Sequence, residues 1–357
     1  MKNVTMAMIR KAPVVNGWSI LDDGGRVSVA NNVCIGKNVE IRNGVNVGCR
    51  THIGHNVLLD NYVDIAGDVH IDDNVIIHEA TNIDPYSIIH NNVFIGTYCN
   101  LGGVVIQPNS FIGNRVNTYR NDRDASQCVF IGKRTNVDND VSIGYNVSIG
   151  EGGQIADYVT IGPDTSIERN VVIGRNSHIG GHSRLYDYVK LGRFAAIDDN
   201  VCIRRNTEIG NNFVARPMVE ISNDCVVHDN VTLGNLAYLE PLVLVQKDVT
   251  IGESASVGIG TRVDQNACIC DNVVVPPHWV VSSGAKLKRS PICILGTKEP
   301  IGYTGCHNYV YMDGKYFPLD QGVFNRYMYD NDYTDEETKE YELHFKYVHE
   351  WLKLHKD

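Results

Sequence analysis

The chain has 357 residues, with 42 acidic and 32 basic side chains and a formal net charge of −10. This charge argues against a general nucleic-acid or anionic-membrane binder, because phosphate contacts need a basic face. The length allows two domains or one elongated domain, so the pattern along the chain must decide.

The first 26 residues precede any repeat and are expected to form an N-terminal cap. Their apolar stretch is interrupted by Arg10, Lys11 and Pro13, which argues against a signal peptide, and no later run approaches a membrane span. Apart from Cys268-x-Cys270, the ten cysteines lack zinc-site spacing, which favours reduced thiols. We therefore expect a cytoplasmic protein without nucleic-acid or membrane partners.

A six-residue period dominates the chain from residue 27. Residues 27–98 and 129–284 divide into hexads without a slip, and the third residue is Ile, Leu or Val in every hexad except at Ala215. Neither a helix nor an ordinary strand has a period of six sustained over this length. Gly, Asp, Asn or Arg commonly follows the third residue, which predicts a short strand and a tight turn in each hexad.

Hexads such as VCIGKN and VSIGYN resemble those of the hexapeptide-repeat acyltransferase family. The resemblance implies an all-β fold, a left-handed parallel β-helix with three hexads per coil. Residues 27–289 would then form about fourteen coils, a rod roughly 65–70 Å long at the strand spacing of about 4.8 Å. The resemblance is specific for fold and much less so for function.

The repeat is interrupted once. Residues 99–103 are one residue short, and extra residues then give an extruded loop at 117–127. In hexapeptide transferases such loops reach over an active site at a subunit boundary, so this resemblance makes Tyr119, Arg120 and Arg123 candidate substrate contacts. The alternative is that the loop is solvated or locks subunits together and does not contact substrate.

Residues 290–357 carry nine of the eighteen tyrosines and are expected to form a small C-terminal cap. Thr334 and Glu337 form a capping box, and Tyr341, Phe345 and Val348 follow at helical spacing. This pattern predicts a terminal α-helix. Because an open β-helix end is an exposed edge, both terminal segments are expected to cover such edges.

The end of the repeat, VPPHWVVSSGAKLKR at 275–289, resembles the closing segment of maltose and galactoside acetyltransferases. That resemblance implies acetyl-CoA, or another acyl-CoA, as donor and places its phosphates near Gly284, Ala285, Lys286 and Arg289. This chain lacks the Asn-Pro that the family has between Gly and Ala. The alternative is that Pro276 and Pro277 only terminate strand pairing.

Two histidines are candidates for the general base. His228, in CVVHDNVTLGN, resembles the catalytic histidine region of UDP-N-acetylglucosamine acyltransferases, although it directly follows the inward Val227, one place earlier than in the family. His55, in THIGHNVLLDN, matches the family's HIGH spacing better. It lies about twelve coils, on the order of 60 Å, from Gly284, so one coenzyme molecule cannot serve both.

Residues eighteen apart should stack, which predicts an outward column of Cys34, His52 and His70. Zinc shared across a trimer, as in the γ-class carbonic anhydrases, would need a histidine spacing that is absent, so no metal is expected. His90 should lie two coils from the loop, and a separate pocket of His90, Gln107, Arg120 and Arg123 is conceivable.

These features favour a homotrimeric acyltransferase that acts on a hydroxyl or amine of a sugar or nucleotide-sugar, with His228 as base. The alternative is a non-catalytic trimeric β-helical scaffold or fibre, as in a virion or surface assembly. The repeat is longer than a transferase needs, which favours the scaffold. Binding of an acyl donor near His228 would discriminate between the two hypotheses.

Overall fold

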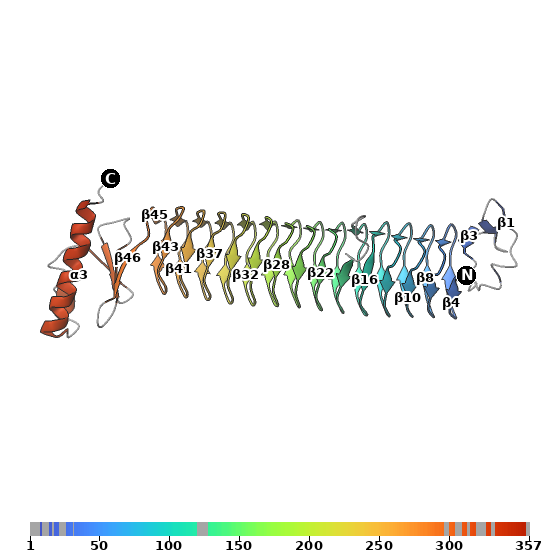
Figure 1. Cartoon of the computed structure of the whole chain (residues 1–357), viewed down its shortest axis with the longest axis horizontal. Helices are drawn as coiled ribbons and strands as arrows, with labels where there is room; N and C mark the ends of the chain where they lie inside the picture. The colour runs from blue at the N-terminus through green and yellow to red at the C-terminus, as the bar shows by residue number, and fades with distance from the viewer. Residues whose placement is uncertain are drawn as a thin grey trace. The chain divides into compact units, whose positions relative to one another are not determined.

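The computed structural model describes residues 8, 14–15, 18–20, 26–30, 32–119, 128–295, 300–303, 309–312, 315–318, 326–329 and 333–354. The chain divides into two compact units, Met1–Met218 (unit 1) and Val219–Asp357 (unit 2). Short parallel strands run through both (Figure 1). The expected left-handed parallel β-helix of about fourteen coils, with a small C-terminal helical region, is confirmed.

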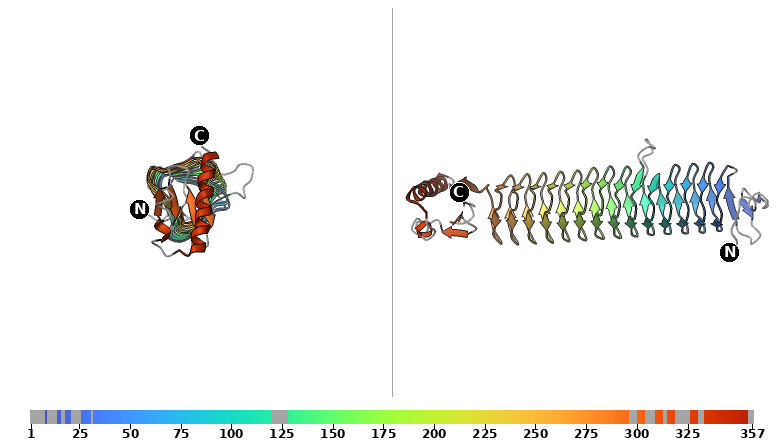
Figure 2. Two further views of the ribbon diagram at one scale, coloured as in Figure 1. Left: turned by 90° about the vertical axis from the view of Figure 1, so that its left-hand side faces the viewer. Right: turned by 90° about the horizontal axis from the view of Figure 1, so that it is seen from below.

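Each coil of unit 1 contributes one strand to each of three parallel sheets (Figure 2). Sheet I contains β3 (Arg26–Val29), β6 (Asn46–Val47), β9 (Asp64–Ile65), β12 (Asn82–Ile83), β15 (Asn100–Leu101), β18 (Asn117–Thr118), β21 (Ser142–Ile143), β24 (Thr160–Ile161), β27 (His178–Ile179), β30 (Ala196–Ile197) and β33 (Val214–Ala215). Sheet II contains β4 (Cys34–Ile35), β7 (His52–Ile53), β10 (His70–Ile71), β13 (Ile88–Ile89), β16 (Val104–Ile106), β19 (Val129–Ile131), β22 (Ser148–Ile149), β25 (Ser166–Ile167), β28 (Arg184–Leu185) and β31 (Cys202–Ile203). Sheet III contains β5 (Glu40–Ile41), β8 (Leu58–Leu59), β11 (Ile76–Ile77), β14 (Phe94–Ile95), β17 (Phe111–Ile112), β20 (Asn136–Val137), β23 (Gln154–Ile155), β26 (Val172–Ile173), β29 (Lys190–Leu191) and β32 (Glu208–Ile209).

Before the first coil, β1 (Val14–Val15) pairs antiparallel with β2 (Trp18–Ile20), and β2 pairs antiparallel with β3. The antiparallel pairing ends where the repeat begins. The predicted boundary of the N-terminal cap at residue 26 stays a prediction.

Unit 2 repeats the three-sheet arrangement. Sheet IV contains β34 (Glu220–Ile221), β37 (Tyr238–Leu239), β40 (Ser256–Val257) and β43 (Val274–Val275). Sheet V contains β35 (Val226–Val227), β38 (Leu244–Val245), β41 (Arg262–Val263) and β44 (Val280–Val281), and sheet VI contains β36 (Thr232–Leu233), β39 (Thr250–Ile251), β42 (Cys268–Ile269) and β45 (Lys286–Leu287). An antiparallel sheet follows, made of β46 (Ile292–Leu295), β47 (Pro300–Tyr303), β48 (Tyr309–Met312) and β49 (Lys315–Pro318).

The core consists of the first and third residues of the hexads. In the hexad that begins at Val159, for example, Val159 and Ile161 are buried and Thr160 between them is exposed. The inward third residue was predicted, and the burial of the first residue is an addition from the structure. The second residue of each hexad therefore points outward, and the side chain of the fourth residue can lie on the same face.

The tight turn depends on a different position from the one expected. The sixth residue has positive φ, as at Asn56 (56°) and Tyr62 (60°), so the left-handed backbone does not fall on the residue after the inward position. Glycine at that fourth position has another role, because a Cβ on Gly162 would lie 2.5 Å from the backbone nitrogen of Gly181. It lets successive coils approach closely.

Asparagines at the sixth position form a ladder at the turn between sheets II and III. Each side-chain Nδ2 donates to the Oδ1 of the next asparagine at 3.0–3.1 Å, through Asn38, Asn56, Asn74, Asn92 and Asn109. Asparagine tolerates the left-handed conformation and satisfies its own polar groups along the column. The left-handed turn and the hydrogen-bonded column thus explain why asparagine is frequent at the sixth position.

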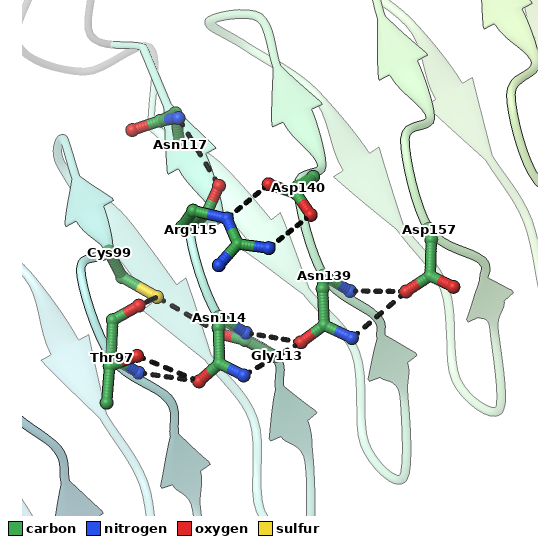
Figure 3. Close-up of polar contacts among 9 residues, drawn as sticks. All are labelled: Thr97, Cys99, Gly113, Asn114, Arg115, Asn117, Asn139, Asp140 and Asp157. Carbon is green, nitrogen blue, oxygen red and sulfur yellow. Dashed lines mark hydrogen bonds and ion pairs between the residues drawn. The ribbon is translucent and has the colours of Figure 1, made fainter.

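The coils keep their register across the irregular region. Asn117 pairs with Asn100 on one side and with Ser142 on the other, so the first two residues of the expected loop, Asn117 and Thr118, belong to β18. At the turn between sheets III and I, the backbone and side-chain N–H groups of Asn114 donate to Oδ1 of Asn139 at 2.9 and 3.0 Å (Figure 3). Hydrogen bonds thus connect the coils before and after the insertion.

The expected C-terminal helix is α3 (Asp335–Leu354), preceded by a short helical stretch at 326–329. The capping box is confirmed, since the Glu337 N–H donates to Thr334 Oγ1 at 3.3 Å and the Thr334 N–H to Glu337 Oε2 at 2.8 Å. Tyr341, Phe345 and Val348 are buried on one side of the helix. None of the described helices is both long and apolar enough to cross a membrane. The predicted boundary of this cap at 290 stays a prediction.

We expect Ile161→Ala to destabilise the protein strongly, because Ile161 is 1% exposed and its loss leaves a cavity between stacked coils. A cost of about 2–5 kcal/mol is typical of such a change. The exposed neighbour Thr160 supplies the matched control, since Thr160→Ala removes no core contact. Chemical denaturation followed by circular dichroism should show a lower midpoint for the first variant only. Equal midpoints for the two variants would contradict the burial pattern.

Arg115 and Asp140 form an ion pair across the insertion, with Arg115 Nη2 2.7 Å from Asp140 Oδ2 (Figure 3). The hydrogen bonds from Arg115 lower the pKa of Asp140. The pair therefore stabilises the fold at pH values above the ordinary carboxylate pKa, which is about 3.9. This contribution is lost as the pH falls through the lowered pKa.

Arg115→Gln should therefore lower the melting temperature slightly at pH 7, as expected for an exposed pair, and the difference from wild type should shrink as the pH falls below about 3.9. Arg175→Gln, at an exposed turn position, is the control and should leave the melting temperature unchanged over the same pH range. A difference between Arg115→Gln and wild type that does not shrink on acidification would rule out the pair as its cause.

Candidate functional site

The histidine expected to act as general base lies in unit 2, directly after β35. Val227 ends this strand with a buried side chain, and His228 is exposed. The backbone N–H of His228 donates to the carbonyl oxygen of Val245 at 2.9 Å. Among the residues that the structure describes, no hydrogen-bond or ion-pair partner of its imidazole is found. The neighbouring side chains therefore do not select one ring tautomer.

The predicted donor segment begins at the same corner of unit 2 as His228. Strands β35, β38, β41 and β44 pair in succession, so the turns after the first and the last of them are three strand spacings apart, about 14 Å. His228 begins the first of these turns, and Gly284 ends the last. The structure thus places His228 and Gly284 along one edge, whereas Lys286 lies on the adjoining strand β45 and Arg289 lies beyond it.

Three of the four predicted donor residues are accessible. Gly284 has φ 70°, and a Cβ built on it would meet no atom within 4 Å, so its backbone faces open space. Lys286 and Arg289 have exposed side chains. Ala285 is 8% exposed and belongs to the core, so its side chain contributes to packing.

The donor segment carries a local excess of positive charge. Lys286, Lys288 and Arg289 are exposed within four residues of each other, in a chain whose formal net charge is −10. Cys268 pairs with Lys286 in the neighbouring strand. Burial raises the pKa of the Cys268 thiol, and Cys270 raises it further. The Cys268 thiol therefore stays protonated at neutral pH and does not cancel the charge.

Cys225 lies three residues before His228 and is not a nucleophile. It is fully buried, and burial raises the pKa of its thiol to about 11. Its Sγ donates to the carbonyl oxygen of Glu240 at 3.2 Å. Since the thiolate is the reactive form, Cys–His chemistry is unfavourable at this corner.

The alternative base, His55, takes part in turn structure in unit 1. Its Nδ1 accepts the backbone N–H of Lys37 at 2.7 Å, and its own backbone N–H donates to Asp73 Oδ1 at 2.6 Å. The neutral ring must then carry its proton on Nε2, so neither ring nitrogen offers a lone pair to a substrate. His55 is therefore a weaker candidate for the general base than His228, whose imidazole has no such contact among the described residues.

The predicted column of Cys34, His52 and His70 exists on sheet II. Cys34 pairs with His52 and His52 with His70, and the two imidazole rings stack at 4.8 Å with an interplanar angle of 11°. Stacked rings hold their nitrogens side by side rather than converging on one point. Within the described ranges there is no group of three His, Cys, Asp or Glu side chains that could hold a metal ion.

Of the three predicted substrate contacts in the loop, only Tyr119 is described. Its backbone N–H donates to the carbonyl oxygen of Ile143 at 2.9 Å, and its side chain is 54% exposed. Arg120 and Arg123 lie outside the described residues. The substrate role of the loop stays a prediction.

The sequence analysis missed the acidic partner of His90. On sheet II, Asp72 Oδ2 lies 2.9 Å from His90 Nδ1, and Asp72 Oδ1 lies 2.8 Å from His70 Nε2. Asp72 and His90 are fourth residues of hexads eighteen positions apart. The stacking rule that predicted the His52–His70 column could have found this pair if it had been applied to the fourth position.

A second histidine–aspartate contact lies on sheet III. Asp60 Oδ2 is 3.3 Å from His78 Nδ1, while Asp60 Oδ1 is 2.9 Å from Arg42 Nη1. Burial acts to raise the pKa of Asp60, but hydrogen bonds from Asn61, Arg42 and His78 outweigh it and leave this pKa lowered. Because Arg42 shares the carboxylate and the contact with His78 is long, Asp60 orients His78 less firmly than Asp72 orients His90.

The family model that matches describes bacterial transferase hexapeptide (six repeats), over residues 152–187. No curated protein matches the chain. The matched residues lie in unit 1, between β23 and β28, and coincide with two coils of the β-helix. The match thus agrees with the repeat that the sequence and the structure show independently.

Several solved structures are similar to the chain. UDP-N-acetylglucosamine acyltransferase of Francisella novicida is 17% identical with a TM-score of 0.21, covering 57% of this chain and 63% of its own. The Arabidopsis enzyme of the same description is 15% identical with a TM-score of 0.24, over 88% and 78%.

A mutant of GDP-perosamine N-acetyl transferase from Caulobacter crescentus, in complex with CoA and GDP-perosamine, is 22% identical with a TM-score of 0.20. It matches 32% of this chain and 53% of its own. The chain thus spans less than two thirds of the Francisella and Caulobacter proteins, and TM-scores this low carry no argument about activity. The period of six, the parallel coils and the family-model match over residues 152–187 show that the chain is built of hexapeptide repeats.

Proposed function

We propose that the chain transfers an acyl group, most simply acetyl, from coenzyme A to a hydroxyl or amine of a small acceptor, a sugar or nucleotide-sugar. The observation that carries the proposal is the single edge of unit 2 that holds both His228 and Gly284, the first residue of the predicted donor segment; Lys286 follows directly on β45. The proposed donor and acceptor are of the classes present in the Caulobacter complex, CoA and a nucleotide-sugar. The proposal itself rests on the position of His228 and Gly284 along one edge of unit 2.

The proposed roles follow from exposure and charge. Lys286 and Arg289 would attract the phosphates of the coenzyme, and Gly284 would let its backbone approach closely because no side chain intervenes. The thioester would then extend along the edge toward His228, about 14 Å away. His228 would accept the proton from the attacking hydroxyl or amine.

We propose that the active form is a homotrimer. An apolar column on sheet III of unit 1 supports this, because Leu58, Ile76, Phe94 and Phe111 occupy outward positions of four successive strands. The rings of Phe94 and Phe111 stack at 4.9 Å, and Phe111 is 42% exposed. Such a column is stabilised by burial against a second copy.

The proposed compartment is the cytoplasm. The eight cysteines whose side chains are described are all free thiols, and Cys34 and Cys49 are exposed. Exposed free thiols fit a reducing compartment.

Isothermal titration of the full-length protein with acetyl-CoA should give micromolar affinity, reduced at least about tenfold in Lys286→Ala because a charge-assisted contact to phosphate is lost. Lys133→Ala, an exposed lysine of unit 1, is the control and should bind as wild type does. His228→Ala should keep donor binding and lose turnover. Absence of binding to wild type would refute the transferase and favour the non-catalytic scaffold.

Replacing both stacked rings by Phe94→Ser and Phe111→Ser should shift the sedimentation of the protein from trimer toward monomer, because the apolar contact is removed. Phe194→Ser is the control, since Phe194 is 53% exposed but lies at a turn outside the column. A wild-type protein that sediments as a monomer would contradict the proposed assembly.

A further inference from the structure

The carboxylate of Asp72 fixes the tautomer of His90. A carboxylate oxygen can only accept a hydrogen bond, so the 2.9 Å contact with Asp72 Oδ2 requires His90 Nδ1 to be the donor. The neutral ring then keeps its lone pair on Nε2. This is the arrangement a general base needs, with one nitrogen oriented by an acid and the other available to substrate.

Asp72 is itself well held. Its other oxygen, Oδ1, lies 2.8 Å from His70 Nε2, and its backbone N–H donates to the carbonyl oxygen of Ile89 at 2.8 Å. The side chain of Asp72 is 27% exposed and that of His90 32%, so both are partly shielded from water. His70 is more exposed, at 48%, and its ring stacks on His52, which makes it the supporting group rather than the base.

The surroundings of His90 suit a neutral, partly apolar substrate. Ile88 precedes it on the same strand, and Val105 and Phe130 continue the outward column in register, with Phe130 37% exposed. Gln107 holds the next fourth position, one coil beyond His90, and a carboxamide can donate a hydrogen bond to a developing oxyanion. Other titratable groups along this face and its turn include Cys34, His52, His55, His70 and Asp73, and Lys133 and Arg134 follow β19, two coils from His90.

We infer that Asp72, His90 and Gln107 on sheet II of unit 1 form a second site, independent of the donor edge of unit 2, that hydrolyses small uncharged acyl esters. Asp72 is the positioning residue and His90 the base. As the oxygen of water bonds to the acyl carbon, its proton passes to His90 Nε2. When the bond to the alcohol oxygen breaks, His90 returns that proton to the leaving group, giving a carboxylic acid and an alcohol.

The test is hydrolysis of p-nitrophenyl acetate by the full-length protein. The rate should exceed that of an equal concentration of imidazole, because the ring of His90 is oriented by Asp72. His90→Gln should lower kcat by about 100-fold, the usual worth of a positioned base. Asp72→Asn should lower kcat about tenfold without changing KM, because it disturbs the tautomer rather than substrate contact.

His178→Gln is the matched control, since His178 is an exposed histidine on an outward strand position without a carboxylate contact among the described residues. It should hydrolyse the ester at the wild-type rate, and all variants should melt within a few degrees of wild type. A wild-type rate no greater than that of imidazole, or equal losses in His90→Gln and His178→Gln, would overturn the inference. Titration of the wild-type protein with acetyl-CoA is a separate readout from ester hydrolysis, so failure of this site and failure of the coenzyme A site are distinguishable.

Discussion

Backbone hydrogen bonds between successive coils are the constraint on which this structure depends. From β4 to β45 each strand is only two or three residues long, so a coil on its own could not satisfy its polar groups or bury its aliphatic side chains. Stacking solves both problems together, because the first and third residues close the core while the N–H and C=O groups pair with the coils on either side. Every other feature follows from keeping that register.

The register converts sequence spacing into spatial columns. Residues eighteen apart lie in adjacent strands, so outward side chains form continuous rows along a face. Asparagines within one row hydrogen-bond to each other at the turns, and phenylalanines within one row stack. A row that contains both histidine and aspartate forms polar pairs. Where the chain inserts residues after Tyr119, the columns continue across the insertion with a different spacing in sequence.

The histidines show why residue type alone does not assign a role. His55 matches a family motif, yet its Nδ1 accepts a backbone N–H and serves the turn. His90 belongs to no motif, yet a carboxylate orients its ring. His228 lies on the edge at which the donor segment begins, and its ring has no such contact among the described residues. The difference comes from the neighbouring coil in each case, through the atoms it presents to the imidazole.

The sequence alone determined the fold, because a period of six with an aliphatic third residue allows only one way to bury those side chains and pair the backbone. It also determined the capping box of the terminal helix and the position of the irregular region. It missed the burial of the first residue and placed the left-handed turn residue two positions early. Only the tertiary structure decided which polar groups meet, such as Asp72 with His90 or Arg115 with Asp140, since such contacts depend on the direction and rotamer of side chains from different coils.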